Sequence, residues 1–222
     1  MKNIALIRHD LFYKILEVKN VDTLKVGNPC SWKLCMKDLN ENSCIISAGV
    51  GGDISFEIEM HKLTGAKIIL LDPSPTGAST INNTPKDQME GIVFLPFGLA
   101  ANSGMRTFAL PKDKCEGSYS YDHGGMETVS FECRSIKDLM KEYKFAHVDL
   151  LKMDVEGFEW DILDEILKSQ LNISQICVEF HNLHGRYRSG IQRYLTLLRM
   201  RFNGYKLISH VGTGDHTFLK KN

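Results

Sequence analysis

Short apolar runs alternate with helical hydrophobic patterns from residue 44 onward. The runs are typical of buried strands, whereas apolar residues three or four positions apart indicate helices that cover a sheet. Strands are predicted at 44–48, 67–71, 92–97, 106–110, 128–133, 148–153, 175–180, 205–209 and 216–220. Helices are predicted after Asp53, from Ser135 to about Tyr143, over 160–167, and over 191–202. This alternation predicts βαβ units and a mostly parallel sheet with helices on both faces.

The first 43 residues do not follow this alternation, apart from one possible strand at 33–36. We therefore expect an N-terminal appendage at 1–43 and a single α/β domain over 44–222. The length of 222 residues agrees with one domain plus an appendage.

Composition narrows the class of protein further. A chain with 43% hydrophobic and 24% charged residues is neither disordered nor of low complexity. No apolar run approaches the ~20 residues of a membrane span, and Arg8, His9 and Asp10 interrupt any N-terminal signal segment. The six cysteines form no CxxC pair, which is typical of free thiols in a reducing compartment. We expect a cytoplasmic protein.

Charge is balanced overall, with 27 basic and 27 acidic residues, so a bulk nucleic-acid binder is not expected. The balance is uneven, because residues 182–222 carry 8 Lys and Arg but only 1 acidic residue. This basic segment either faces an anionic acceptor or forms a solvated helix face.

A glycine-rich turn, Gly49-Val50-Gly51-Gly52, follows the strand at 44–48, and Asp72 follows the next strand, 23 residues after Gly49. An acid about 20 residues after a glycine turn is placed to bind ribose hydroxyls at the carboxyl edge of a sheet. The pair favours an adenosine-containing ligand. The third glycine of a dinucleotide fingerprint is replaced by Ile54, so NAD is disfavoured but stays open.

Two further acids, Asp154 and Glu156, directly follow the strand at 148–153. Carboxylates in this position can fix an amino group, accept a proton or hold a hard metal ion. Glu159, slightly later, reads as an acid in the first turn of a helix, where the helix dipole favours it.

The segment LLKMDVEGFEWDIL at 150–163 resembles the signature of FkbM-type methyltransferases, LKxDVEGxExxVL. The order of motifs also matches, from the glycine turn and the acid after the second strand to a later strand that ends in Glu-x-His. The resemblance covers about residues 44–220. It implies a class I, Rossmann-like methyltransferase fold, a doubly wound sheet of seven strands with an antiparallel last strand. It also implies S-adenosylmethionine as cofactor, and usually methylation of a hydroxyl oxygen.

The resemblance assigns roles by position. Gly49 and Gly51 would line the methionine part of the cofactor, Asp72 would bind its ribose, and Asp154 and Glu156 would lie beside the transferred methyl group. The remaining expected cofactor contacts are Gly98 and Leu99, which would flank the adenine, and Asp53. The sequence departs from the family at Ser47, where an acid is usual, and at Asp53, where a glycine is usual.

His181 follows the strand at 175–180, next to the two acids in this fold. We expect it to be the general base that removes the acceptor's hydroxyl proton, with a pKa near its ordinary value of ~6.5. A structural histidine bonded to backbone is the alternative. Asp154, Glu156 and His181 could also bind a divalent metal, although a metal-free site is favoured.

The acceptor side is expected on two polar segments. Tyr119, Tyr121 and His123 lie on a loop, and Arg186 and Arg188 follow the strand at 175–180. Tyr and His bond sugar hydroxyls, and Arg binds anionic groups. The sequence thus predicts a methyltransferase that uses S-adenosylmethionine and methylates a carbohydrate or another small hydroxyl-bearing, possibly anionic, acceptor. An NAD-dependent oxidoreductase and a non-catalytic nucleotide-binding module remain as alternatives.

Overall fold

The structure is a computed structural model. It describes Tyr13 and residues 16–111, 119–121, 127–181, 190–212 and 214–221, without the side chains of 190–192.

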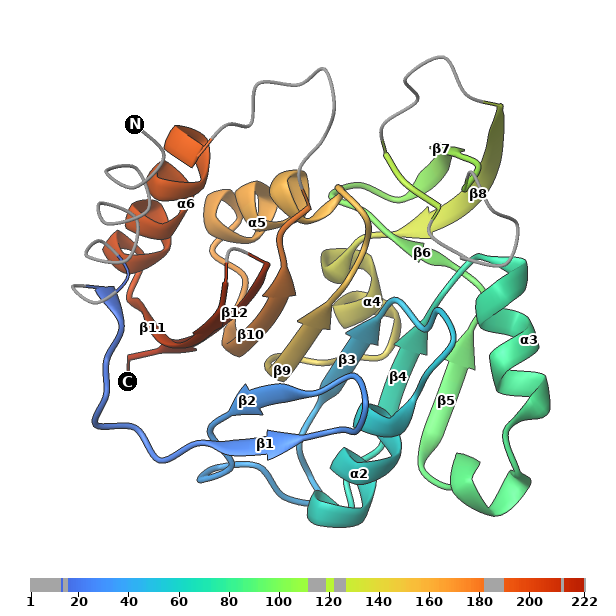
Figure 1. The fold of residues 1–222 in the computed structure, drawn as a ribbon, viewed down its shortest axis with the longest axis horizontal. Coiled ribbons are helices and arrows are strands. Elements are labelled where there is room, and N and C mark those ends of the chain that lie inside the picture. The colour runs from blue at the N-terminus through green and yellow to red at the C-terminus, as the bar shows by residue number, and fades with distance from the viewer. Residues whose placement is uncertain are drawn as a thin grey trace.

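A seven-stranded sheet forms the centre of the molecule, in the order β11-β12-β10-β9-β3-β4-β5 (Figure 1). Its strands are β3 (Ile45–Ala48), β4 (Ile68–Leu71), β5 (Ile92–Leu95), β9 (Val148–Met153), β10 (Ile173–Glu179), β11 (Tyr205–Val211) and β12 (Asp215–Lys220). The pairs from β10 to β5 are parallel, and β12 is antiparallel to both β10 and β11. The predicted doubly wound sheet with an antiparallel last strand is confirmed.

Strand order reverses beside β3. The chain runs from β3 outward through β4 to β5 and then returns to β9 on the other side of β3. In such a sheet the carboxyl ends of the strands around the reversal leave a crevice for ligands. The glycine turn after β3 and the acids after β9 both open onto that crevice.

Both faces of the sheet are covered, because successive residues of a strand point to opposite sides. Ile45 belongs to the core cluster under helix α2 (Ser55–Thr64), while Ile46 belongs to the larger cluster on the other face. Three helices supply buried residues to that larger cluster: α4 (Ile136–Glu142), α5 (Glu159–Lys168) and α6 (Gly190–Phe202). Trp160 is buried there.

A second, three-stranded sheet has the order β6-β8-β7. It consists of β6 (Gly98–Leu99), β7 (Gly104–Ala109) and β8 (Thr128–Arg134). Figure 1 shows it above α3 and β5, at the carboxyl end of the main sheet. It therefore forms a side wall for whatever binds at that end.

The N-terminal region forms an antiparallel hairpin of β1 (Leu24–Val26) and β2 (Trp32–Leu34). Trp32 and Leu34 are buried in the same cluster as Phe56 and Met60 of α2. In Figure 1 the hairpin, in blue, lies on the near side of the sheet beside α2. The hairpin thus covers part of one sheet face.

Two helices were not predicted, α3 (Pro75–Asn83) and the short 3-10 helix η1 (Lys86–Met89), and neither were the short strands β1 and β6. The α3 sequence PTGASTINN is rich in Gly, Ser, Thr and Asn, which favour turns over helices, and it shows little apolar periodicity. What starts the helix is local: Ser74 caps it by accepting a hydrogen bond from the Gly77 N–H, and Pro75 occupies its first turn.

The predicted start of a helix at Ser135 is confirmed, because Ser135 caps α4 by accepting a hydrogen bond from the Asp138 N–H. Gly65 ends α2 in the left-handed conformation. The cysteines for which a state is described, Cys30, Cys35, Cys44, Cys133 and Cys177, are free thiols. Within the described ranges, no helix combines the length and apolar character that a membrane crossing requires.

Candidate active site

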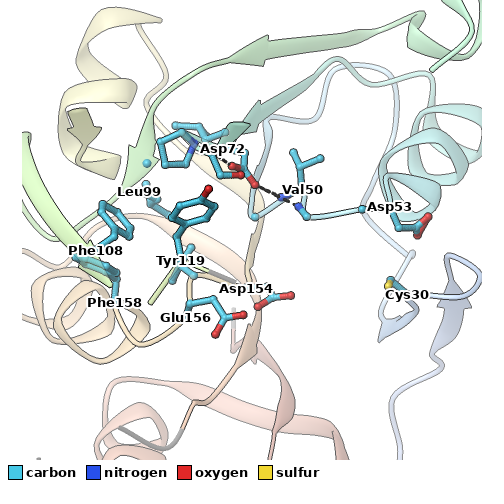
Figure 2. Close-up of a pocket in the computed structure, with 18 residues that line it drawn as sticks. Cys30, Val50, Asp53, Asp72, Leu99, Phe108, Tyr119, Asp154, Glu156 and Phe158 are labelled. Carbon is cyan, nitrogen blue, oxygen red and sulfur yellow. Dashed lines mark hydrogen bonds between the residues drawn. The ribbon is translucent and has the colours of Figure 1, made fainter. Parts of the chain in front are cut away.

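A cavity of about 310 Å³ opens at the carboxyl ends of β3, β4 and β9 (Figure 2). This volume lies at the lower end of the usual range for small-molecule sites, ~300–1,000 Å³. Its lining combines the glycine turn, the residues after β4 and β5, the acids after β9, and aromatic side chains of the wall. The lining residues are Cys30, Gly49, Val50, Gly51, Gly52, Asp53, Leu71, Asp72, Pro73, Ser74, Gly98, Leu99, Phe108, Tyr119, Asp154, Val155, Glu156 and Phe158.

The glycine turn requires glycine for two different reasons. Gly49 has a φ of 92°, and a Cβ there would lie 1.9 Å from the Asp154 carbonyl oxygen. This close approach lets the turn after β3 pack against the acids after β9. Gly51 also has a positive φ, 52°, but a Cβ there would meet nothing within 4 Å. Gly51 therefore leaves open space beside the cavity.

Asp72 holds the glycine turn in place. Its Oδ2 accepts hydrogen bonds from the N–H groups of Val50 (2.8 Å) and Gly51 (3.2 Å), and its Oδ1 accepts one from Ser74 (2.7 Å). The side chain is buried, with the residue only 6% exposed, and Figure 2 shows the bonds to the turn as dashed lines. Asp72 thus lines the cavity and organises the backbone there, while its binding of a ribose stays a prediction.

The two positions at which the sequence departs from the family pattern, Ser47 and Asp53, both form hydrogen bonds with residues of α2. Ser47 donates a hydrogen bond of 2.5 Å to the buried carboxylate of Glu57, so α2 supplies an acid next to β3. The Lys152 ammonium donates to the Gly49 carbonyl oxygen at 2.6 Å. Asp53 accepts hydrogen bonds from the backbone N–H (3.1 Å) and hydroxyl (2.7 Å) of Ser55, at the start of α2.

An aromatic wall closes the side of the cavity opposite Asp53. Phe108 and Phe158 are buried with ring centroids 4.7 Å apart, and Tyr119 lies near them. In Figure 2 the Tyr119 ring lies between Leu99 and the Asp154–Glu156 pair. Gly98 and Leu99, which follow β5, border the same space. A flat, mostly apolar surface of this kind suits a planar ring system.

A strained turn presents the two acids after β9. The Asp154 N–H donates to the Ala48 carbonyl, which fixes the turn to β3. Glu156 has a φ of 49°, a left-handed conformation that is uncommon for a residue with a side chain. The Glu156 carbonyl accepts a hydrogen bond from the Tyr121 N–H at 2.9 Å. Such strain persists only where the surroundings hold it, and it is common at functional sites.

His181 lies beside these acids, as predicted. Its Nε2 is 3.7 Å from Asp154 Oδ1, 3.5 Å from Glu156 Oε2 and 3.9 Å from Glu179 Oε1. The side chain is 22% exposed, at the rim of the cavity. We refer to Asp154, Glu156 and His181 as the rim triad.

The predicted pKa of His181 is wrong. Burial alone would lower the pKa of the imidazole, but the carboxylates of Glu159, Glu156 and Asp154 outweigh it and raise the pKa to about 9. Burial, reinforced by the charge of Asp154, raises the pKa of the nearby Glu179 to about 7. The sequence predicted that these residues lie at strand ends, but it did not show how many carboxylates would surround the His181 ring.

Glu159 is the functional residue whose role the sequence did not reveal. It lies in the first turn of α5, as expected, but it is fully buried. Its Oε2 accepts a hydrogen bond from the Gly157 N–H and its Oε1 one from the His181 N–H, both at 2.7 Å. Glu159 therefore links the turn after β9 to the end of β10. The sequence feature that could have indicated this role is the position of Glu159 within the DVEGFE segment.

The predicted acceptor residues are only partly described. Tyr119 lines the cavity itself, and the Tyr121 ring packs edge-on against Phe158 at 4.8 Å. His123, Arg186 and Arg188 lie outside the described residues.

The strand order, the antiparallel β12 and a cavity at the reversal point define a class I methyltransferase domain, the fold of S-adenosylmethionine-dependent methyltransferases. The family model described as "Methyltransferase FkbM domain" matches residues 28–207. The chain therefore belongs to the FkbM methyltransferase family, and the resemblance seen in the sequence is confirmed.

Individual relatives are distant. The chain is 25% identical over 158 residues to "Methyltransferase sdnD" of Sordaria araneosa, a match that covers 57% of this chain and 61% of that protein. An rRNA methylase from Streptococcus thermophilus shares 10% identity and a TM-score of 0.46, covering 83% of this chain and 90% of that one. A precorrin-6y C5,15-methyltransferase from Geobacter metallireducens shares 10% identity and a TM-score of 0.44, covering 83% and 84%.

Proposed function

We propose that this protein transfers a methyl group from S-adenosylmethionine to a hydroxyl oxygen of a carbohydrate or another small acceptor. The observation that carries the proposal is the position of the rim triad. In a chain of the FkbM family, these side chains stand at the mouth of a cavity that also contains the glycine turn and Asp72.

The cavity supports a placement of the cofactor. The methionine part would run along Gly49 and Gly51, where the open space beside Gly51 admits a ligand. The ribose would lie at Asp72, and the adenine would lie between Leu99 and the aromatic wall. Asp53, Gly98 and Asp154 border the same space and complete the proposed contacts.

The chemistry is a direct displacement. The acceptor oxygen forms a bond to the methyl carbon, the carbon–sulfur bond breaks, and its electron pair stays on sulfur, which leaves S-adenosylhomocysteine. The hydroxyl proton passes to the rim triad, the group of side chains that borders the proposed position of the methyl group. A positioned proton acceptor contributes ~10²–10⁴-fold in rate.

The rim also bears on the acceptor. Asp154, Glu156 and Glu179 place carboxylates where the acceptor must enter, and like charges there disfavour an anion. Tyr119 borders the cavity from the other side, and aromatic rings with a hydroxyl suit sugar-like molecules. We therefore favour a neutral polyhydroxyl acceptor over the anionic one that the basic C-terminal segment suggested. Tyr121, His123 and Arg186 remain candidate acceptor contacts.

Calorimetry separates this function from its alternatives. We expect the purified chain to bind S-adenosylmethionine and S-adenosylhomocysteine at one site and NAD not at all. A screen of sugars and glycosides with methyl-labelled cofactor should then yield a labelled methyl ether. Binding of NAD alone would support an oxidoreductase, and cofactor binding without transfer to any hydroxyl would leave a binding module.

A further inference from the structure

Three potential metal-ligand atoms converge at the rim of the cavity. One carboxylate oxygen each from Asp154 and Glu156 and one ring nitrogen of His181 all lie within 4.8 Å of one another. The distances of 3.5 and 3.7 Å from Nε2 to the two oxygens are longer than hydrogen bonds. Ligand atoms that share one ion at bonds of ~2.1 Å stand ~3.0–3.5 Å apart, so small rotations would bring all three onto a common ion.

The backbone holds these atoms in place. Asp154 is tied through its N–H to Ala48 of β3, and Glu156 is fixed in a left-handed turn. The His181 N–H is bound by Glu159. The three side chains therefore start from the rigid ends of two neighbouring parallel strands, β9 and β10.

A buried carboxylate stands behind the histidine. Glu159 Oε1 lies 3.6 Å from His181 Nδ1, on the side of the ring away from Nε2, and Glu159 is 0% exposed. Nδ1 is buried without a hydrogen bond at this distance. Histidines that bind metals generally direct their second nitrogen toward a carboxylate or carbonyl, which fixes the ring orientation. A slight ring movement toward Glu159 would complete that arrangement.

We propose that Asp154, Glu156 and His181 bind one divalent cation of the first transition row, such as Mn²⁺, at the rim of the cofactor cavity. Two carboxylates balance the ionic charge, and mixed oxygen and imidazole donors suit such ions better than Ca²⁺ or Mg²⁺. This proposal replaces the metal-free site that the sequence favoured.

The catalytic part of the proposal rests on the proposed function. A cation held here would stand where an acceptor hydroxyl meets the methyl group. Its Lewis acidity would lower the pKa of that hydroxyl and so make the oxygen a better nucleophile, and the proton would pass to the carboxylate oxygen of Asp154 or Glu156 that does not bind the ion.

A nearby residue provides a matched control. Asp215 of β12 is the register partner of Glu179, and its charge is felt by the same cluster. It contributes no atom to the converging set. Asp215→Asn removes one negative charge from the region and leaves the three ligand atoms in place.

The test is a titration of the full chain, treated with EDTA and desalted, with MnCl₂, in which free Mn²⁺ is measured by electron paramagnetic resonance. We expect one ion per chain and, in spin-echo spectra of bound Mn²⁺, modulation from an imidazole nitrogen. Asp154→Asn should weaken the affinity by at least ~100-fold and Glu159→Gln by ~10-fold, whereas Asp215→Asn should change it less than ~3-fold. Thermal unfolding establishes that each variant is folded.

The outcomes separate the metal from the methyl transfer. No stoichiometric Mn²⁺ binding, no nitrogen modulation, or equal weakening in Asp154→Asn and Asp215→Asn would overturn the site. Full methyl transfer in excess EDTA would overturn its catalytic role and leave the proposed function standing. Specific Mn²⁺ binding in a chain that binds no S-adenosylmethionine by calorimetry would instead overturn the proposed function and leave the metal site standing.

Discussion

The two halves of the candidate site are held together in different ways. At the ends of β3 and β4, Asp72 satisfies three backbone N–H groups with hydrogen bonds of 2.7–3.2 Å. At the ends of β9 and β10, His181 Nε2 stands 3.5–3.9 Å from three carboxylate oxygens. The first half is closed by its own hydrogen bonds, whereas the distances in the second leave room for a further atom between the groups.

This difference fits two different functions, the binding of a cofactor and the catalysis of a reaction. A cofactor pocket gains affinity when its backbone is preorganised, and in the proposed cofactor site the Asp72 hydrogen bonds hold the glycine turn in one conformation. A reaction centre needs charged groups whose partners change as the reaction proceeds, and the rim triad offers such groups. Substitutions in the two halves should therefore affect different measurements.

Gly49→Ala should have the largest effect, because Gly49 is where the two halves touch. A Cβ at 1.9 Å from the Asp154 carbonyl oxygen forces the turns apart, and we expect a loss of at least ~3 kcal/mol in the free energy of unfolding. Gly51→Ala is the control, since its φ of 52° is also positive but a Cβ there meets no close neighbour, and it should cost ~1–2 kcal/mol. Urea denaturation measures both, and equal losses would show that the close approach does not matter.

His181→Ala tests the reactive half alone. We expect the rate of methyl transfer to fall by at least ~100-fold. The affinity for S-adenosylmethionine should be unchanged, because His181 belongs to the rim triad but does not line the cavity. Single-turnover kinetics and calorimetry on the same preparation give the two values. A near-normal rate on the true acceptor would return His181 to a structural role.

Asp72→Ala tests the preorganised half. It should weaken S-adenosylmethionine binding by ~1–3 kcal/mol, the range of hydrogen bonds to charged groups. It should also lower stability, because three backbone N–H groups lose their acceptor. Asp72→Asn keeps one acceptor oxygen and should be milder in both respects. An unchanged dissociation constant in folded Asp72→Ala would remove this residue from the cofactor site.

Tyr119→Ala should have the smallest effect, and it shows which ligand meets the aromatic wall. The ring contacts Phe131 edge-on at 5.4 Å and borders the cavity, so its loss should weaken binding by ~0.5–1.5 kcal/mol. A rise in the KM for S-adenosylmethionine alone would assign the wall to the cofactor, and a rise for the acceptor alone would assign it to the acceptor. Tyr119→Phe should leave both KM values within ~2-fold, unless the hydroxyl itself binds.

The secondary structure of strongly apolar segments that end in turn residues could be predicted from the sequence. The strands at 45–48 and 68–71 consist almost entirely of buried residues, so their sequences read as strands without any tertiary information. Helix α3 was missed because its stability comes from a cap and from packing of Ile81 against the core, and not from periodicity. The hairpin at 24–34 was seen only in part, because its burial depends on α2, which lies later in the chain.

The sequence was sufficient to predict which residues of the candidate site lie at the ends of strands. Glycines, acids and a histidine at the carboxyl ends of strands had to meet at one edge, because parallel strands end on the same side. Distances and protonation were not predictable, since the pKa of His181 depends on three acids, Asp154, Glu156 and Glu159, that come from another segment of the chain. The role of Glu159 was hidden for the same reason: only burial distinguishes it from an ordinary acid at a helix start.

The sequence by itself determined the class of protein. The alternation of apolar runs with helical patterns set the α/β fold, and the DVEG segment identified the family, because both are local patterns that the chain carries wherever it folds. Tertiary structure alone decided that Asp72 organises the glycine turn, and that Glu159 braces His181. It also decided that the rim triad stands at distances suited to an ion. These properties arise from atoms brought within a few ångströms by strand pairing, and no spacing along the chain encodes them.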